Sequence, residues 1–362
     1  MKLLIVSLLF LPLTVWAQRV TFINPGKSNE VYWVTATKAM QMAASSLNMQ
    51  LEVIYTEREH LKSIDIAKQL ISRSSNDRPE YVIFSNDYGL APNLLNLFNK
   101  EQIPCLMAFS SPSSKERSQT GSPRENFKYW LGSIEPDADY GGYITAIDLI
   151  KKGRQKNLRA PDGKIHLLAI AGDRSTNSSI LRNEGMLRAV KESRDVILDQ
   201  LVYADWQKKL AAEKAEWLLK RHPSAKLIWS GNDQMSFGAM ETLEKNGGTP
   251  GKTVLFSAIN TSPEAFSALQ SERLSTLAGG HFIAGAWAMV MIHDYARGID
   301  FANEGLNLVK PMFTLFTKND AKVFLKHFGD HPIPIDFKQY SKYYNSAFKK
   351  YHFELNSQKN NE

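Results

Sequence analysis

The stretch that decides the fold is LIWSGNDQMSFGAMETLEKN, residues 227–246. Its first three residues are apolar and predict a buried strand, and the polar turn Ser230-Gly231-Asn232-Asp233 follows at once. Apolar positions then recur at helical spacing up to Asn246, which predicts a helix. A short strand that leads through a polar turn into a helix is typical of a βαβ unit, so this stretch indicates a parallel sheet.

The same alternation recurs on both sides of this stretch, with a Ser-, Gly- and Pro-rich loop at 110–123 between two runs of it. The other predicted strands are 19–24, 51–55, 81–84, 104–109, 165–169, 196–203, 253–258, 274–277 and 309–316. The other predicted helices are 32–47, 61–73, 92–100, 178–190, 207–221, 263–269 and 284–297. We therefore predict an α/β fold of two Rossmann-like lobes with parallel sheets, and a site at the carboxyl ends of the strands.

Composition excludes several classes of protein. The chain has 362 residues, 43% hydrophobic and 22% charged, which suits two globular domains rather than a disordered or fibrous chain. The net charge of +7 comes without a basic stripe, so no nucleic-acid partner is predicted. Cys105 is the one cysteine, which excludes an intramolecular disulfide and a cysteine-based zinc site, and its apolar surroundings predict a buried thiol.

The amino terminus has the layout of a secretory signal peptide. Residues 1–17, MKLLIVSLLFLPLTVWA, place Lys2 before an apolar stretch, and Val15 and Ala17 stand at the −3 and −1 positions of a cleavage site. The apolar stretch is shorter than the about 20 residues of a transmembrane helix. We expect cleavage after Ala17, a periplasmic mature chain that begins at Gln18, and, since no cysteine follows, no lipid anchor.

Catalytic motifs are missing from the sequence. It contains no Gly-x-Ser-x-Gly, no phosphate-binding Walker loop, no His-Glu-x-x-His and no Gly-x-Gly-x-x-Gly. The eight histidines are scattered and show no metal-ligand spacing. We therefore predict a protein that is not an enzyme, with no catalytic residue, no metal site and no cofactor. An enzyme whose nucleophile and base lie far apart in sequence stays open as an alternative.

Binding signals are stronger, because amides and aromatic rings gather where predicted strands end. Flat rings stack on the apolar CH faces of a sugar, and amides hydrogen-bond to its hydroxyls. Helix capping by Asp233, Ser178 and Ser262, and core packing of the tryptophans, are the structural alternatives. The stretches that carry these side chains are 29–33, 85–88, 203–206, 230–233 and 259–263, and they favour Trp33, Trp206 and Asn232 as ligand contacts.

Several of these stretches resemble the type I periplasmic binding proteins, in the branch that binds ribose and galactose. The segment 229–239 is similar to that family's strand–Asn-Asp–x-Met-Ala-x-Gly-Ala helix, and Arg182-Asn183-Glu184-Gly185 to its Arg-x-x-Gly helix. The segments 29–33 and 258–263 are similar to two further loops of the family. The resemblance covers essentially the whole chain after residue 17.

The resemblance implies two lobes joined by three crossovers, near 132–139, 278–281 and 307–310. It places 18–134 plus 279–307 in an N-terminal lobe, 135–278 plus 308–340 in a C-terminal lobe, and 341–362 in a polar C-terminal tail. It also implies ligand contacts at Tyr32, Trp33, Asn86, Trp206, Asn232 and Asn260, with Arg182 as a further candidate. His281 is a further candidate, although Gly279-Gly280-His281 departs from the family, which often has a glutamine or asparagine at the end of this hinge strand.

Two departures from the family affect the ligand. Phe109-Ser110-Ser111 stands where sugar binders commonly carry Asp-Arg, and neutral Asn260 stands where they carry an acidic residue. Because charge-assisted hydrogen bonds are about twice as strong as neutral ones, these changes favour a ligand other than a simple pentose or hexose. The loop 110–126 is also longer than in small sugar binders, and its sequence leaves open a lid, a partner surface or an edge loop.

The resemblance implies a monomeric, exported receptor for a small carbohydrate-like ligand. It would close around the solute by hinge bending and present it to an inner-membrane ABC permease. The alternative is a sensor subunit that signals to a membrane histidine kinase or chemoreceptor. Both roles use lobe closure, so both stay open here.

Overall fold

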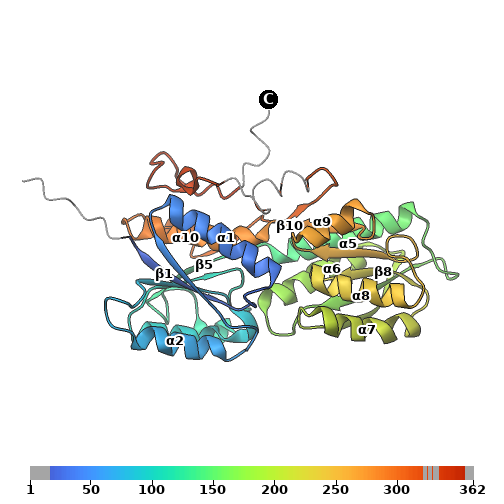
Figure 1. Ribbon diagram of the computed structural model, residues 1–362, viewed down its shortest axis with the longest axis horizontal. Helices are drawn as coiled ribbons and strands as arrows, with labels where there is room; N and C mark the ends of the chain where they lie inside the picture. Colours follow the sequence, from blue (N-terminus) through green and yellow to red (C-terminus); the bar gives the residue numbers. More distant parts are fainter. Residues whose placement is uncertain (1–16, 321–323, 325–327, 329–333, 355–362) are drawn as a thin grey trace, which may run out of the picture.

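The computed structural model describes residues 17–320, 324, 328 and 334–354. The expected signal peptide therefore falls almost wholly outside the described residues. Two six-stranded sheets form the centres of two lobes that lie side by side (Figure 1). None of the helices in the described ranges has the length and apolar character needed to cross a membrane. The predicted α/β fold with two lobes is confirmed.

The first sheet has the strand order β11-β5-β4-β3-β1-β2, and every neighbouring pair in it is parallel. Its strands are β1 (Arg19–Asn24), β2 (Gln50–Tyr55), β3 (Tyr81–Phe84), β4 (Cys105–Ala108), β5 (Trp130–Pro136) and β11 (Asn307–Lys310). The second sheet has the order β12-β10-β9-β8-β6-β7, and its edge pair β10–β12 is antiparallel. Its strands are β6 (Ile165–Ala171), β7 (Val196–Tyr203), β8 (Ala225–Ser230), β9 (Leu255–Ile259), β10 (Thr276–Gly279) and β12 (Thr314–Leu315).

Helices cover both faces of each sheet, which explains the almost unbroken apolar runs of the central strands. In β1, Val20 and Phe22 pack toward α1 and α10, and the next residue, Ile23, packs on the opposite face, toward α2 and α3. The first-lobe helices are α1 (Val31–Ser46), α2 (Lys62–Ser72), α3 (Ala91–Lys100), α4 (Arg117–Thr120) and α10 (Ala284–Tyr295). Cys105 lies in the α2–α3 layer and is a buried, free thiol, as predicted.

The second lobe follows the same rule. In β6, Leu168 and Ile170 pack toward α7, α8 and α9, whereas Leu167 and Ala169 pack toward α5 and α6. The second-lobe helices are α5 (Ala138–Gln155), α6 (Asn177–Glu192), α7 (Lys208–Arg221), α8 (Asp233–Lys245) and α9 (Pro263–Gln270). Four apolar layers, two in each lobe, thus hold the sheets and fix the loops at their carboxyl ends.

One predicted strand and one lobe boundary differ from the structure. The predicted strand 309–316 is two strands, because β11 pairs with β5 in the first sheet and β12 pairs with β10 in the second. Pro311 lies between them, lacks a backbone N–H, and interrupts strand pairing there. Residues 308–310 therefore belong to the first sheet, whereas the resemblance implied that the second lobe begins at residue 308, and the chain crosses between sheets at 311–313.

The segment 334–354 also lies on the first lobe rather than the second, above α1 and α10 (Figure 1). It contains a short 3₁₀ helix, Phe337–Tyr340, which is buried against that core. The Trp287 ring on α10 stacks on Phe353 with 4.9 Å between ring centroids and an interplanar angle of 9°. The described part of the expected polar tail is thus anchored by aromatic packing.

The helix α5 and the strand β5 were not predicted, and α5 positions part of the site. Gly141-Gly142 weakens the helical signal of its sequence, since glycine disfavours helix interiors. The packing requires one of these glycines, because a Cβ on Gly142 would lie 2.0 Å from the backbone oxygen of Arg182. A Cβ on Gly185 of α6 would lie 1.9 Å from the Asp139 oxygen. The two helices therefore touch backbone to backbone beneath Arg182.

Candidate functional site

A cavity of about 50 Å³, open in part to solvent, lies where the carboxyl ends of the strands of both sheets meet. It is lined by residues of both lobes. Every sequence-predicted contact except Asn86 is among them. The lining residues are Glu30, Tyr32, Trp33, Arg58, Ser85, Asp87, Phe109, Pro136, Thr176, Ser178, Arg182, Trp206, Asn232, Asn260 and His281.

Asn86 is buried beside the cavity and does not line it. Its Oδ1 accepts a hydrogen bond of 2.8 Å from the backbone N–H of Ala91, and its Nδ2 donates to Glu116 at 3.1 Å. Both polar ends are thus used to fix the start of α3 and the loop 110–126. The structure places Ser85 and Asp87 at the cavity instead, since successive loop side chains face different sides.

Aromatic rings form the first-lobe wall of the cavity. The Trp33 ring is 4% exposed and lies edge-on to Phe109 and to Tyr32, with centroid distances of 5.1 and 4.9 Å. Its other edge rests on Gly26, where a Cβ would lie 1.8 Å from the ring. Trp33 is therefore largely a core residue with one edge at the cavity, and Tyr32, at the cavity wall, is less buried.

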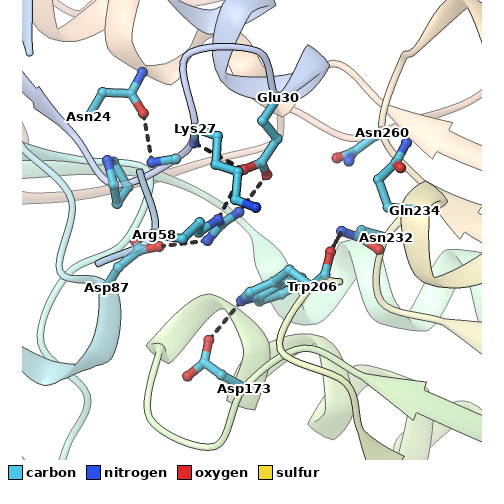
Figure 2. A network of polar contacts seen from close by, with 12 residues as sticks. Asn24, Lys27, Glu30, Arg58, Asp87, Asp173, Trp206, Asn232, Gln234 and Asn260 are labelled. Carbon is cyan, nitrogen blue, oxygen red and sulfur yellow. Dashed lines mark hydrogen bonds and ion pairs between the residues drawn. The ribbon is translucent and has the colours of Figure 1, made fainter. Parts of the chain in front are cut away.

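Trp206 forms the second-lobe counterpart. It follows β7 with a φ of 63°, a left-handed backbone conformation that side chains rarely adopt. Its ring lies on Gly172, and its Nε1 donates to Asp173 Oδ2 at 2.8 Å (Figure 2). Burial raises the pKa of Asp173, but hydrogen bonds from Thr176 and other donors, Trp206 included, outweigh burial and leave it below its ordinary value.

Asn232 is the N-cap of α8. Its Oδ1 accepts from the backbone N–H of Met235 at 2.8 Å, and its Nδ2 donates to the backbone oxygen of Trp206 at 3.2 Å (Figure 2). The alternative that assigned the cap to Asp233 is therefore wrong by one residue. Asn232 combines a capping role with a place at the cavity, so its substitution affects both.

Asn260 and Asp233 form a buried pair behind the cavity. The Asn260 Nδ2 donates to Asp233 Oδ1 at 2.8 Å, and Asn260 has a φ of 138°. Burial raises the pKa of Asp233, and hydrogen bonds from Ser262 and Asn260 partly offset this rise. Ser262 caps α9 through a bond from Ala265, as the capping alternative predicted. Asn260 thus uses its donor internally and leaves its amide oxygen for other partners.

Arg182 and His281 form a buried pair at the cavity wall. Arg182 Nη2 donates to His281 Nε2 at 2.9 Å, and Arg182 Nη1 donates to the Gly231 oxygen at 2.7 Å. The imidazole of His281 is stacked between Tyr32 and Phe313, at centroid distances of 4.8 and 4.6 Å. Burial, with the Arg182 charge, holds the pKa of His281 well below its ordinary value, so the imidazole is neutral.

Eight lining residues were not predicted as contacts, and three of them are charged: Glu30, Arg58 and Asp87. Arg58 Nε donates to Glu30 Oε2 at 3.0 Å, and Arg58 Nη1 lies 3.7 Å from Asp87 Oδ2 (Figure 2). Burial raises the pKa of Asp87 to about 6, although Arg58 and a bond from Ser85 lower it. Arg58 lies in the loop after the predicted strand 51–55, so the rule that places sites at strand ends could have indicated it.

The two lobes touch directly at the edge of the cavity. The backbone N–H of Tyr88, in the first lobe, donates to Thr176 Oγ1, in the second, at 3.2 Å. The ring of His60 stacks on Tyr88 with 3.6 Å between centroids. Within the described residues, no group of three or more His, Cys, Asp or Glu side chains is arranged to hold a metal ion. The residues that line the cavity offer aromatic rings, amides and charged groups.

Comparisons with known proteins agree with this architecture. The family model described as "Periplasmic binding protein domain" matches residues 20–300. A periplasmic sugar-binding protein from Pseudomonas fluorescens is 34% identical, with a TM-score of 0.82 over 93% of this chain and 98% of that chain. A search of curated protein sequences gave no significant match.

Two more distant structures share the fold. An ABC transporter periplasmic solute binding protein from Actinobacillus succinogenes with bound D-allose is 16% identical, with a TM-score of 0.68 over 85% of this chain and 99% of that chain. A twin-arginine translocation pathway signal protein from Burkholderia phytofirmans is 18% identical, with a TM-score of 0.74 over 94% and 99%. The family consists of binding proteins rather than enzymes, as the sequence predicted. This chain belongs to the periplasmic binding protein family.

Proposed function

We propose that this protein is an exported receptor that captures a sugar-like small molecule in the cavity between its lobes and delivers it to an ABC importer. The observation that carries the proposal is the lining of one cavity, from both lobes, by aromatic rings together with amide and guanidinium groups. That combination suits a small polar ligand with apolar faces. The 34% identical sugar-binding protein of Pseudomonas fluorescens supports the same class of ligand.

Recognition divides between the two lobes. Tyr32 offers an aromatic surface from the first lobe and Trp206 from the second, and each suits the CH face of a sugar ring. The amides of Asn232 and Asn260 and the guanidinium of Arg182 supply hydrogen bonds to ring substituents. We propose that the residues predicted from sequence, Asn86 excepted, contact the ligand directly.

Capture requires that the ligand bind the closed form better than the open form, since only differential affinity shifts the equilibrium. A molecule held between Tyr32 and Trp206 joins the lobes and supplies that difference. The bond from Tyr88 to Thr176 already joins them at the edge of the cavity. We propose that the ligand-closed form, as a monomer, docks on an ABC permease.

We propose further that residues 1–17 are a signal peptide cleaved in the periplasm. Amino-terminal sequencing of the protein from a periplasmic extract tests this point. A mature chain that begins at Gln18 supports it, and a chain that retains Met1 contradicts it.

A thermal-shift screen of the chain from Gln18 tests the ligand class. The panel contains pentoses, hexoses, sugar acids, sugar alcohols, disaccharides, nucleosides and amino acids. At about a hundred times its Kd, a specific ligand stabilises the protein by roughly 2.7 kcal/mol. Trp206→Ala is expected to abolish the shift, whereas Trp217→Ala, which removes a 38% exposed ring on α7, is the matched control and retains it. Shifts by amino acids or nucleosides alone would contradict a sugar receptor.

Uptake measurements test delivery. Deletion of the gene should abolish accumulation of the labelled sugar that the screen identifies, and the wild-type gene should restore it while the Trp206→Ala gene should not. If the deletion strain takes up the sugar normally but loses a sugar-induced transcriptional response, the partner is a membrane sensor kinase and not an importer.

A further inference from the structure

Arg182 is a buried cation at the cavity that lacks a carboxylate partner. It is 6% exposed, and it forms no ion pair with any residue that the structure describes. Its guanidinium lies 5.4 Å from the Trp206 ring centroid and 5.6 Å from that of Phe313. Both of its hydrogen-bonded partners, the Gly231 oxygen and His281, are neutral. A desolvated cation without an anion is costly, and burial accordingly lowers the pKa of Arg182 to about 10.

His281 adds a second donor at the same place. A guanidinium can only donate, so His281 Nε2, which faces Arg182 Nη2, accepts and carries no proton. The proton of the neutral ring then resides on Nδ1. Nδ1 of His281 and Nε of Arg182 are both buried, and neither has a hydrogen-bond partner among the described residues. Arg182 and His281 thus present two buried N–H donors that have no acceptor among the described residues.

The carboxylates near the cavity are already engaged by other donors. Glu30 and Asp87 share the guanidinium of Arg58. Asp173 accepts from Trp206 and from its own loop, and Asp233 accepts from Asn260. None of the four therefore makes a direct contact with Arg182, although Asp87 and Asp233 attract it at longer range.

We propose that the ligand of this cavity is an acidic sugar whose carboxylate pairs with Arg182, beside His281. The inference rests on the proposed function and names the substrate class of the same site. A carboxylate supplies two acceptor oxygens in the plane that a guanidinium fork matches, and its single charge balances that of Arg182. A phosphate dianion would bring a second negative charge close to Glu30 and Asp87, so the charge balance favours the carboxylate.

Titration calorimetry with matched pairs tests the inference on the chain from Gln18. The pairs are glucose with glucuronate, galactose with galacturonate, mannose with mannuronate, and glucose with gluconate, and glucose 6-phosphate is added. In the pair that binds, the acid is expected to bind at least tenfold more tightly than the neutral sugar. The preference should weaken as salt rises from 50 to 500 mM, because it is electrostatic.

Variants assign the preference to Arg182. Arg182→Gln should reduce the affinity for the acid to that for the neutral sugar. Arg188→Gln is the matched control, since Arg188 lies on the same helix α6, is exposed and pairs with Asp139, and it should keep the full preference. Circular dichroism confirms that both variants are folded.

The outcomes separate the two proposals. Equal or tighter binding of the neutral sugar in the pair that binds overturns the acidic-sugar inference and leaves the sugar receptor standing. Tighter binding of glucose 6-phosphate than of every carboxylate overturns the assignment of a carboxylate. Failure of every member of every pair to bind a folded protein overturns the inference, and a screen that is silent for all other sugars as well overturns the proposed function.

Discussion

The indole ring of Trp206 lies so close to Gly172 that a Cβ at that position would be 2.3 Å from Trp206 Cζ2. The ring is also held by its bond to Asp173 and by a left-handed backbone at Trp206 itself. Gly26 supports Trp33 in the first lobe in the same way. Both tryptophans are thus positioned by a glycine that leaves room for a ring at the end of a strand.

Gly172→Ala should therefore impair binding, because the added methyl group displaces the Trp206 ring while Trp206 itself is unchanged. We expect a loss of affinity of at least tenfold for the sugar that the wild type binds, with the lobes still folded. Calorimetry gives the affinity and urea unfolding gives the stability. Gly231→Ala is the comparison variant, because its Cβ would lie 3.6 Å from the same ring, at Trp206 Cζ3, and so contacts the ring without displacing it. Wild-type affinity of Gly172→Ala would show that the position of Trp206 does not matter.

Substitution of Asn232 should reduce the stability of the protein and its affinity for the ligand for two separate reasons. Asn232→Ala removes the cap of α8, which costs about 1 kcal/mol of unfolding free energy, and also removes the amide at the cavity. Asn232→Ser keeps an oxygen that can accept from Met235 but lacks the donor to Trp206. We expect Asn232→Ser to unfold near the wild-type urea midpoint and to bind at least tenfold more weakly. Wild-type affinity of Asn232→Ser in calorimetry would reduce Asn232 to a cap alone.

Much of the fold could be predicted because its central strands are buried on both faces. Such strands appear as short apolar runs, and the predicted bounds of 19–24 and 81–84 agree with β1 and β3. The helix α5 could not be predicted in this way, because the glycine that allows its backbone contact with α6 also weakens the helical pattern. The strands β11 and β12 were merged because four residues and two residues carry too little periodicity to show that they join different sheets.

The candidate site was predictable where one rule applied, namely that loops after parallel strands meet at one edge of a sheet. That rule brought Tyr32, Trp206, Asn232 and Asn260 to the cavity. It failed at Asn86, since the direction of a loop side chain depends on local hydrogen bonds rather than on its place in the sequence. The ion pair of Arg58 with Glu30 joins residues 28 positions apart and leaves no periodic signal, so only the place of Arg58 in the loop after the predicted strand 51–55 could have indicated it.

Asp87 should make the protein less stable as pH rises toward neutrality. Its pKa is raised to about 6 in the folded protein, from about 3.8 in the unfolded chain. Between pH 4 and 6 the folded state therefore binds more protons than the unfolded state, and its stability falls as pH rises, by up to about 1.4 kcal/mol per pH unit. Asp87→Asn removes this contribution, so its stability relative to the wild type should increase from pH 4 to 6.

Urea unfolding at half-unit steps from pH 4.5 to 7 measures that difference. Glu135 and Asp233, whose pKa values are also raised by burial, are present in both proteins and cancel. The lowered pKa of Asp195, held down by bonds from Arg154 and Arg159, acts below pH 4, outside the range. Asp65→Asn, on the exposed face of α2, is the control. A constant difference between Asp87→Asn and the wild type across the range would show that Asp87 does not titrate there.

Asp294 should hold the carboxyl-terminal segment on the first lobe. This residue of α10 is fully buried, and its carboxylate accepts from Ser341 Oγ, from the backbone N–H of Lys342 at 2.7 Å and from Tyr351 Oη at 3.1 Å. Asp294→Ala leaves these three donors without their acceptor, and an unpaired buried donor costs about 1–3 kcal/mol. We expect a loss of about 3 kcal/mol or more in urea unfolding.

Release of the segment can be detected by trypsin. Lys342 is 4% exposed and pairs with buried Glu304, so the wild type should resist cleavage after this residue. In Asp294→Ala, cleavage after Lys342, measured by mass spectrometry in native buffer, should be at least tenfold faster. Asp300→Ala breaks a more exposed pair with Arg124 and is the matched control. If Asp294→Ala resists trypsin as the control does, aromatic packing such as that of Phe353 on Trp287 is sufficient to hold the segment.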